Sequence, residues 1–267
     1  MRPLYIKGAT DKKINLDGPA LKVIAREQAD RYIPLKKISR ITSIGRVEWQ
    51  TEALLACCKR KIPITFMDGK AQIQGQLAPP INNSQPINAE QLLEEYLYDL
   101  QSPEKYRQWL QALETQQIAK LPAQYRNNEH NPEKIKQAIY QKLFPLVIAQ
   151  KLKAYENKLT ALIYEKTSAS LLENGISNTH NDLQLRGINL SQDIAHLALW
   201  QLQKSKITYI KKQHKIAERK RGGKLRLEWQ HAVELIEENK KIIEEEIELL
   251  IYRLKKHLLS EVARNGY

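Results

Sequence analysis

The sequence has few cysteines and no long apolar run. Its 267 residues contain two cysteines, Cys57 and Cys58, which are adjacent. Neighbouring cysteines rarely form a disulfide and the chain offers no zinc-binding pattern, so we expect two reduced thiols. No apolar run approaches the roughly 18 residues that a membrane-spanning helix needs, and no secretory apolar segment begins the chain. The composition argues against disulfide scaffolds, zinc modules and membrane proteins, and predicts a cytoplasmic location.

Acidic residues are in deficit. There are 30 Asp and Glu against 43 Lys and Arg, which leaves a formal net charge of +13. Hydrophobic residues make up 42% of the chain, which is enough for a packed core. A positive excess of this size predicts a polyanionic partner. Nucleic acid is favoured over an anionic membrane surface, because the chain lacks membrane-spanning and secretory segments.

Residues 1–80 have the pattern of a small β-rich domain. Short apolar runs are punctuated by Gly8, Gly18 and Gly45, as in a curled sheet. Residues 51–61 gather Ala, Leu and Cys side chains on one helical face, and Pro63 ends this helix. The predicted strands are residues 4–6, 20–25, 32–35, 38–44, 62–67 and 71–77.

The remainder is predicted to be helical. Residues 81–88 are a polar, proline-containing linker, and residues 89–267 form a larger all-α domain. Ser102 and Asn131 precede prolines and suit helix N-caps, while Gly175 suits a helix end. The predicted helices are 89–100, 103–121, 132–144, 145–174, 190–202 and 228–259. The predicted fold class is therefore α+β, with a β-rich N-terminal domain followed by a helical one.

Positive charge is concentrated between Lys204 and Arg226. This stretch holds ten Lys and Arg and one acidic residue, Glu218. Such a run neutralises phosphates, and a Gly-Gly pair at 222–223 lets backbone N–H groups approach one. A solvated charged face is the alternative interpretation. The predicted DNA-binding residues are Lys211, Lys212, Lys215, Arg219, Lys220, Arg221, Lys224 and Arg226.

Three stretches carry a family resemblance. Residues 32–68 read YIPLKKISRITSIGRVEWQTEALLACCKRKIPITFMD, residues 102–121 read SPEKYRQWLQALETQQIAKL, and residues 159–177 read LTALIYEKTSASLLENGIS, followed by GINLSQDIAHLALW from 187 to 200. These resemble the CRISPR spacer-acquisition integrases, the Cas1 family. Lys61 stands where the family usually has Gly, and the likeness is weak between about 122 and 150.

The resemblance implies a DNA integrase-nuclease. Such proteins form homodimers, assemble with a small Cas2 partner, bind short double-stranded DNA and join its 3′ ends into the CRISPR array. The implied site is a Glu, a His and an acidic residue that hold Mg²⁺ or Mn²⁺, ions suited to hard oxygen ligands. A β-rich dimerisation domain and a helical catalytic domain are implied as well.

The resemblance places the acidic site residues on one helix. Asp193 matches the first acid of the family motif, and His196 stands where the family has a second. Side chains three residues apart share a helix face. Because imidazole is a poorer ligand than carboxylate for Mg²⁺ or Mn²⁺ and brings no negative charge, His196 alters the ligand set.

The remaining two ligands are less clearly marked. His180 lies 13 residues before Asp193, close to the family's loop length, although gap-free counting from the preceding glycine selects Gln184. Glu133 precedes Tyr140 with the family rhythm, but Lys134 replaces the glycine that usually follows; a first-turn Glu also suits the helix dipole.

Three functions stay open on these grounds. One is an active integrase with Glu133, His180 and Asp193 as catalytic residues and His196 as a further metal ligand. Glu114 is the alternative to Glu133. The second is a DNA-binding structural member whose metal site has decayed. The third, an RNA-binding protein of another family, lacks the aromatic platforms that stack bases.

Overall fold

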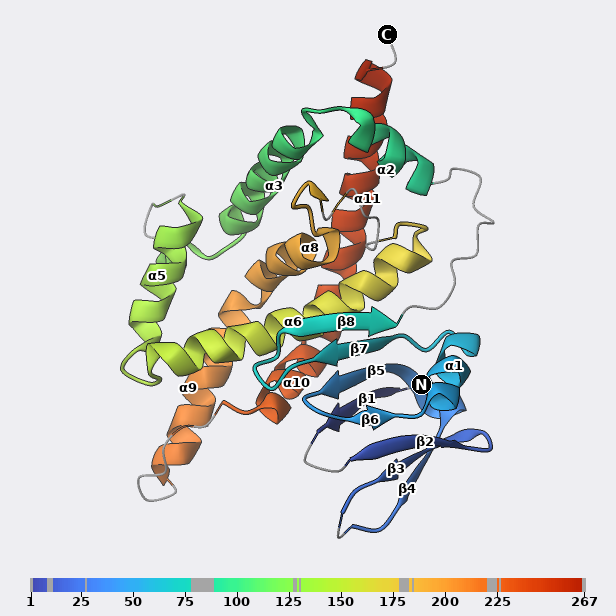
Figure 1. Ribbon diagram of the computed structural model, residues 1–267. Coiled ribbons are helices and arrows are strands. Elements are labelled where there is room, and N and C mark those ends of the chain that lie inside the picture. The colour runs from blue at the N-terminus through green and yellow to red at the C-terminus, as the bar shows by residue number, and fades with distance from the viewer. Residues whose placement is uncertain are drawn as a thin grey trace. The chain divides into compact units, whose positions relative to one another are not determined.

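The computed structural model describes residues 2–8, 12–26, 28–77, 89–126, 129, 131–177, 183, 185–219, 225 and 227–265. The chain divides into two compact units, Met1–Asn82 and Asn83–Tyr267. Strands dominate the first unit and helices the second, which confirms the predicted α+β class (Figure 1). The predicted linker at 81–88 lies outside the described residues. No described helix is long and apolar enough to cross a membrane.

The first unit contains two four-stranded sheets. One has the order β1-β5-β7-β8, with parallel pairing from β1 (Arg2–Lys7) through β5 (Ile38–Ile44) to β7 (Ile64–Met67) and antiparallel pairing to β8 (Ile73–Leu77). The other has the order β4-β3-β2-β6, formed by β4 (Arg31–Pro34), β3 (Ala20–Ile24), β2 (Lys13–Asp17) and β6 (Glu48–Trp49). A short 3-10 helix, Leu35–Lys37, precedes β5.

Both sheets and α1 (Thr51–Lys59) contribute to one apolar core. Ile14 and Leu21 come from one sheet, Ile41 and Ile64 from the other, and Cys57 from α1; all five are fully buried. Burial in apolar surroundings raises the pKa of the Cys57 thiol to about 11, so this cysteine is an inert packing residue, as expected. Both cysteines are free thiols.

The end of α1 contains Lys61, the residue that stands where the family resemblance expects Gly. Lys61 adopts the left-handed conformation, with φ of 58°. Lys61 N–H donates to Cys58 O at 3.0 Å and Ile62 N–H to Cys57 O at 2.9 Å, which is a Schellman motif. Glycine suits this position because it lacks a Cβ, so the lysine carries backbone strain.

The second unit consists of helices arranged around α6 (Ala149–Glu173). This helix is buried along most of its length and packs against α8 (Leu190–Leu199), α10 (Trp229–Glu238) and α11 (Lys240–Asn265). The other described elements are α2 (Ala89–Tyr98), α3 (Ser102–Ala119), α4 (Ala123–Arg126), α5 (Pro132–Leu143), the 3-10 turn Trp200–Leu202 and α9 (Gln203–Arg219).

Four sequence predictions need correction. Strands β2 and β6 were not expected, since β2 is short with charged ends and β6 has two residues. The predicted helix 228–259 is two helices, because the Asn239 side chain donates to Leu235 O at 2.8 Å and accepts from Ser205 Oγ at 2.8 Å. Gln101, not Ser102, is the N-cap of α3. No helix was predicted between residues 202 and 228, yet the basic segment is helical from Lys204 to Arg219, within α9.

Candidate active site and nucleic-acid interface

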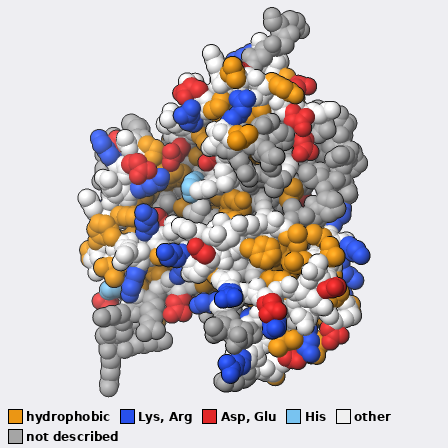
Figure 2. Space-filling view, in the orientation of Figure 1, with side chains coloured by type: hydrophobic (Ala, Val, Ile, Leu, Met, Phe, Trp, Pro, Cys, Tyr) orange, Lys and Arg blue, Asp and Glu red, His pale blue; other side chains and the backbone are white. Residues whose placement is uncertain are grey.

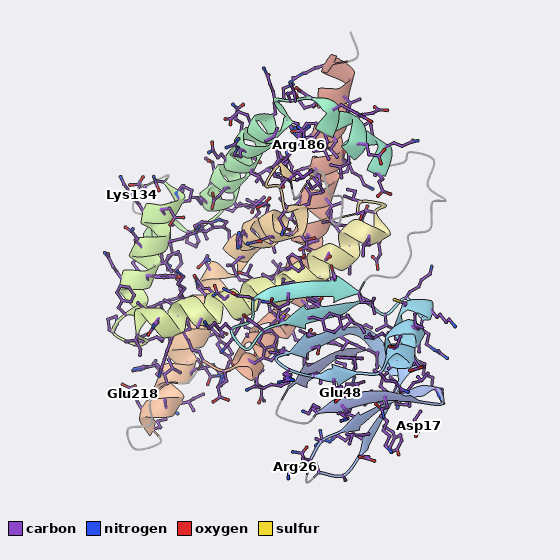
Figure 3. The ribbon with its side chains drawn as sticks, in the orientation of Figure 1. Asp17, Arg26, Glu48, Lys134, Arg186 and Glu218 are labelled. Carbon is purple, nitrogen blue, oxygen red and sulfur yellow. The ribbon has the colours of Figure 1, made fainter. Side chains whose placement is uncertain are left out.

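Asp193 lies in the first turn of α8, where a negative side chain is stabilised by the helix dipole. Asn189 caps this helix by accepting the N–H of Gln192 at 3.1 Å. The preceding segment is fixed by Arg186, which donates from Nη1 to Asp99 O at 2.9 Å and to Ser102 Oγ at 3.0 Å (Figure 3). The start of α8 is therefore tied to the start of α3.

A buried tyrosine holds the Asp193 carboxylate. Tyr106 Oη, from α3, donates to Asp193 Oδ2 at 3.1 Å. Burial raises the pKa of Asp193, and the Tyr106 hydrogen bond opposes that rise. Burial and the adjacent carboxylate hold the pKa of Tyr106 well above its usual value. Tyr106 therefore remains a hydrogen-bond donor, and Asp193 is desolvated and fixed in orientation.

Tyr106 is itself supported by a stack of rings. Its ring lies 5.6 Å from that of Trp109, and Trp109 stacks on His257 of α11 at 5.3 Å with 18° between the planes. His257 Nε2 lies 3.4 Å from the hydroxyl of Tyr96 in α2. Rings from three helices thus restrict the rotamer of the residue that orients Asp193.

His196 lies three residues after Asp193, on the same face of α8. Burial lowers the pKa of its imidazole, and the nearby Lys136 ammonium lowers it further. Glu114 and Glu156 act in the opposite direction. The lowered pKa favours the neutral imidazole, which suits a metal ligand, but the Lys136 cation lies close to it.

That cation, Lys136 of α5, is surrounded by acceptors. Its Nζ lies 3.1 Å from Glu133 Oε1, 3.7 Å from Glu114 Oε1 and 5.4 Å from the centre of the Trp200 ring. Trp200 Nε1 in turn donates to Glu114 Oε1 at 3.0 Å. The ammonium therefore lies between Glu133 of α5 and Glu114 of α3, beside the Trp200 ring that follows α8.

A second lysine, Lys206, is fully buried beside a carboxylate. Lys206 of α9 pairs with Glu156 of α6, which also accepts a hydrogen bond from the Tyr140 hydroxyl. Burial lowers the pKa of Lys206, and the Glu156 carboxylate opposes this. Lys206 had been counted in the basic segment, yet its side chain is 0% exposed. It is a structural residue of the helical unit, and it was not among the predicted DNA-binding residues.

Glu133 does not reach Asp193 in this arrangement. Its side chain is 75% exposed and pairs with Lys136. Its backbone N–H, like that of Lys134, is accepted by the Asn131 side chain, which confirms the predicted N-cap. Lys134, labelled in Figure 3, extends to Glu129 at 3.2 Å. Glu133 therefore behaves as a first-turn glutamate in an exposed ion pair.

The described residues alone do not fit a divalent metal centre. Within them, no group of three His, Cys, Asp or Glu is placed to hold an ion. Asp193 has the character of a ligand, but His196 faces Lys136, whose charge repels a divalent cation. His180 and Gln184 lie outside the described residues.

The candidate nucleic-acid surface begins on α9. Lys211, Lys212, Lys215 and Arg219 are exposed there. Lys220, Arg221, Lys224 and Arg226, with the Gly-Gly pair, lie outside the described residues. Tyr209 is buried and donates to Glu234 Oε2 at 2.6 Å, so it cannot stack on a base. In Figure 2, Lys and Arg side chains over α5, α6 and α9 are interspersed with acidic ones.

Sequence reasoning missed Tyr106 and Lys136. Both lie in helices that were predicted, but neither belongs to a residue type that a metal-ligand search selects. Tyr106 and Asp193 are 87 residues apart, and Lys136 approaches Glu114 across two helices. The useful signal was modest: Tyr106 lies within the stretch 102–121 that carried the family resemblance.

Comparison with known proteins defines the class. The family model described as CRISPR associated protein Cas1 matches residues 4–179. A Cas1 protein from Thermotoga maritima has a similar fold, with a TM-score of 0.63, 14% identity and 97% of each chain covered. A casposase bound to integration product gives a TM-score of 0.56 and 14% identity, over 98% of this chain and 91% of that one.

A third solved structure, a Cas6-RT-Cas1–Cas2 complex, gives a TM-score of 0.57 at 14% identity and covers 97% of this chain and 35% of that one. No curated protein matches the sequence. These likenesses show that the chain shares the fold of these proteins. Because the family model matches well over half of the chain, the chain belongs to the Cas1 family.

Proposed function

We propose that this protein joins the 3′ ends of short double-stranded DNA into a CRISPR array, as a divalent-metal-dependent integrase-nuclease. The observation that supports this most directly is the Asp193 carboxylate, which is partly buried, oriented by Tyr106 and located where the resemblance puts an acidic ligand. Membership of the Cas1 family supports the same role. Family folds alone do not give an activity, so the proposal rests on this site.

The proposed site consists of Asp193, His180 and Glu133 as catalytic residues, with His196 as a further ligand for Mg²⁺ or Mn²⁺. Asp193 has the strongest support. Glu133 would have to leave its ion pair with Lys136, whereas Glu114, held by Trp200 Nε1 at 3.0 Å, already points toward the His196 side of α8. Glu114 is therefore retained as the alternative carboxylate.

The proposed DNA surface is the exposed side of α9 with the residues that follow it. Lys211, Lys212, Lys215 and Arg219 are exposed on the helix that begins just after the helix bearing Asp193. Continuation through Lys220, Arg221, Lys224 and Arg226 would extend the positive charge along a phosphate backbone.

The partners that we propose are double-stranded DNA, a second copy of the chain joined through the unit Met1–Asn82, and a Cas2 protein, with cytoplasmic action. Support comes from the similar solved structures, of which one is a casposase bound to integration product and another is a complex that contains Cas1 and Cas2. The β-rich unit is the proposed dimerisation domain because the family resemblance assigns it that role.

A second candidate function is a DNA-binding subunit without chemistry. The specific observation in its favour is Lys136, whose ammonium lies 3.1 Å from Glu133 and 3.7 Å from Glu114 and lowers the pKa of His196. A fixed monovalent cation among the candidate ligands can balance their charge without a metal ion.

A strand-transfer assay separates the two. A short duplex with 3′-hydroxyl ends is incubated with a supercoiled target, with Mn²⁺ or with chelator, and joined product is measured beside duplex binding. An integrase gives Mn²⁺-dependent product that Asp193→Asn removes while binding is kept. A degenerate subunit binds the duplex with a steep salt dependence and gives no product. Asp30→Asn, an exposed substitution in the first unit, is the matched control.

A further inference from the structure

Helix α11 has two apolar faces. The inner face packs into the helical unit through the buried side chains of Ile243, Ile247, Leu250, Leu254 and Leu258. The outer face carries four large apolar side chains that are exposed to solvent. Their exposed fractions are 50% for Ile242, 38% for Leu249, 63% for Tyr252 and 44% for Leu259. A surface helix that packs on one side normally has a polar outer face, so this second apolar stripe needs an explanation.

The spacing of the outer stripe is that of a helix-pairing seam. Its positions are 242, 245, 249, 252, 256 and 259, which are separated by alternate steps of three and four residues. This repeat averages 3.5 residues, so the stripe stays on one side of the helix over its length. Two charged residues, Glu245 and Lys256, complete the seam, and both are exposed.

The seam is also symmetric about its centre. A two-fold axis between Leu250 and Ile251 would place Ile242 opposite Leu259 of a second copy, and Leu249 opposite Tyr252 of that copy. The same operation places Glu245 opposite Lys256. Apolar residues therefore meet apolar residues, and each charge meets the opposite charge. A parallel arrangement would instead place Glu245 against its own counterpart, so the charges select the antiparallel one.

The wider charge distribution of α11 agrees with this arrangement. Four glutamates lie between positions 244 and 248, and Arg253, Lys255 and Lys256 follow Tyr252. An antiparallel self-pair brings the acidic part of one helix toward the basic part of the other.

We propose that α11 is a second self-association surface, on which a second copy of this chain packs its own α11 in antiparallel orientation. The contact is isologous, so every pair occurs twice. The seam from Ile242 to Leu259 is about 27 Å long at 1.5 Å per residue, long enough for a two-helix interface. This surface is separate from the dimer proposed through Met1–Asn82, and it does not depend on the catalytic residues.

A charge-swap series on the full chain tests the pairing. Sedimentation equilibrium without DNA measures the association constant of wild type, Glu245→Lys, Lys256→Glu and the double variant. Each single swap creates two like-charge contacts, and we expect it to weaken the α11 association at least about ten-fold. The double swap restores opposite charges and should return the constant to within about two-fold of wild type. Glu95→Lys, an exposed substitution of the same sign on α2, should have no effect.

Cross-linking provides a second readout that does not depend on affinity. Single cysteines are introduced by Leu249→Cys or Ser260→Cys in a Cys57→Ala, Cys58→Ala background. In the proposed pair, the two copies of position 249 are about 4.5 Å apart along the helix axis, and the two copies of position 260 are about 28 Å apart. A short bismaleimide should therefore cross-link the Leu249→Cys variant into covalent dimers and leave the Ser260→Cys variant without cross-links. The proposal is wrong if the single swaps leave the association constant unchanged, or if both cysteine variants cross-link equally.

Discussion

The hydroxyl of Tyr106 donates a 3.1 Å hydrogen bond to Oδ2 of Asp193, which joins α3 to the first turn of α8. Tyr106 is buried and Asp193 is partly buried, and the tyrosine is held by the Trp109 and His257 rings. The bond fixes a carboxylate that burial would otherwise drive toward its neutral form. The candidate site thus has a positioning residue, Tyr106, whose contribution can be measured.

Tyr106→Phe should lower DNA joining and shift its pH dependence. The hydrogen bond lowers the pKa of Asp193 against the effect of burial, so its removal raises that pKa further. If the reaction needs ionised Asp193, the acidic limb of the pH–rate profile moves to higher pH. Tyr155→Phe, which removes a buried hydroxyl bonded to His231 O at 3.0 Å, is the control. It should cost about 1 kcal/mol of stability and leave the profile in place. An unshifted profile in Tyr106→Phe would contradict the positioning role.

The pKa of His196 should depend on two neighbouring charged side chains, Lys136 and Glu114. Lys136 lowers the pKa of His196 and Glu114 raises it. Lys136→Met should therefore raise that pKa, and Glu114→Gln should lower it; NMR of the imidazole measures both. Shifts of the same sign in the two variants would mean that these side chains do not surround His196 as described. Lys134→Met removes an exposed lysine two residues before Lys136, at the start of α5, and should leave the pKa of His196 unchanged.

Lys61→Gly should stabilise the protein. Lys61 has a left-handed φ of 58° at the end of α1, the position that Gly175, with φ of 75°, occupies at the end of α6. Removal of the Cβ should raise the free energy of unfolding by about 1 kcal/mol. Lys61→Ala removes the charge but keeps the Cβ, so it should change little. Gly175→Ala should destabilise by a similar amount. Chemical denaturation measures all three, and equal effects of Gly and Ala at position 61 would reject the strain argument.

Duplex binding should depend on the exposed lysines of α9. The variant with both Lys211→Ala and Lys212→Ala should weaken binding and reduce the slope of log affinity against log salt by about two, one for each phosphate contact. The matched variant, with Lys59→Ala and Lys70→Ala, removes two exposed lysines from the first unit. Equal losses in the two variants would show that net charge, not the α9 surface, governs binding.

Local patterns in the sequence predicted most elements but not their partners. The apolar runs at β1, β3, β4, β5 and β7 and the helix α5 with its Asn131 cap were found because period and cap chemistry are local signals. Strand β6 escaped because two residues show no period. The end of α10 at Asn239 was not predicted because the Asn239 side chain bonds to Ser205, a residue 34 positions away.

The site was less predictable than the fold for the same reason. Asp193 was selected from a motif, and in the structure it is partly buried and oriented by a hydrogen bond. Its partner Tyr106 and the cation Lys136 come from separate helices, and no spacing rule connects them. Lys206 shows the opposite error: a lysine counted as surface charge is buried against Glu156, because the α9 face that packs inward includes it.

The measurement that tests the central claim most directly is the yield of joined DNA from Asp193→Asn beside wild type, with a 3′-hydroxyl duplex, a supercoiled target and Mn²⁺. Asparagine keeps the size and an oxygen that can accept from Tyr106, so folding and duplex binding should be retained. The predicted result is Mn²⁺-dependent product from wild type and loss of at least about a hundred-fold in the variant. Equal product from both proteins, or none from wild type that binds the duplex well, would contradict the account.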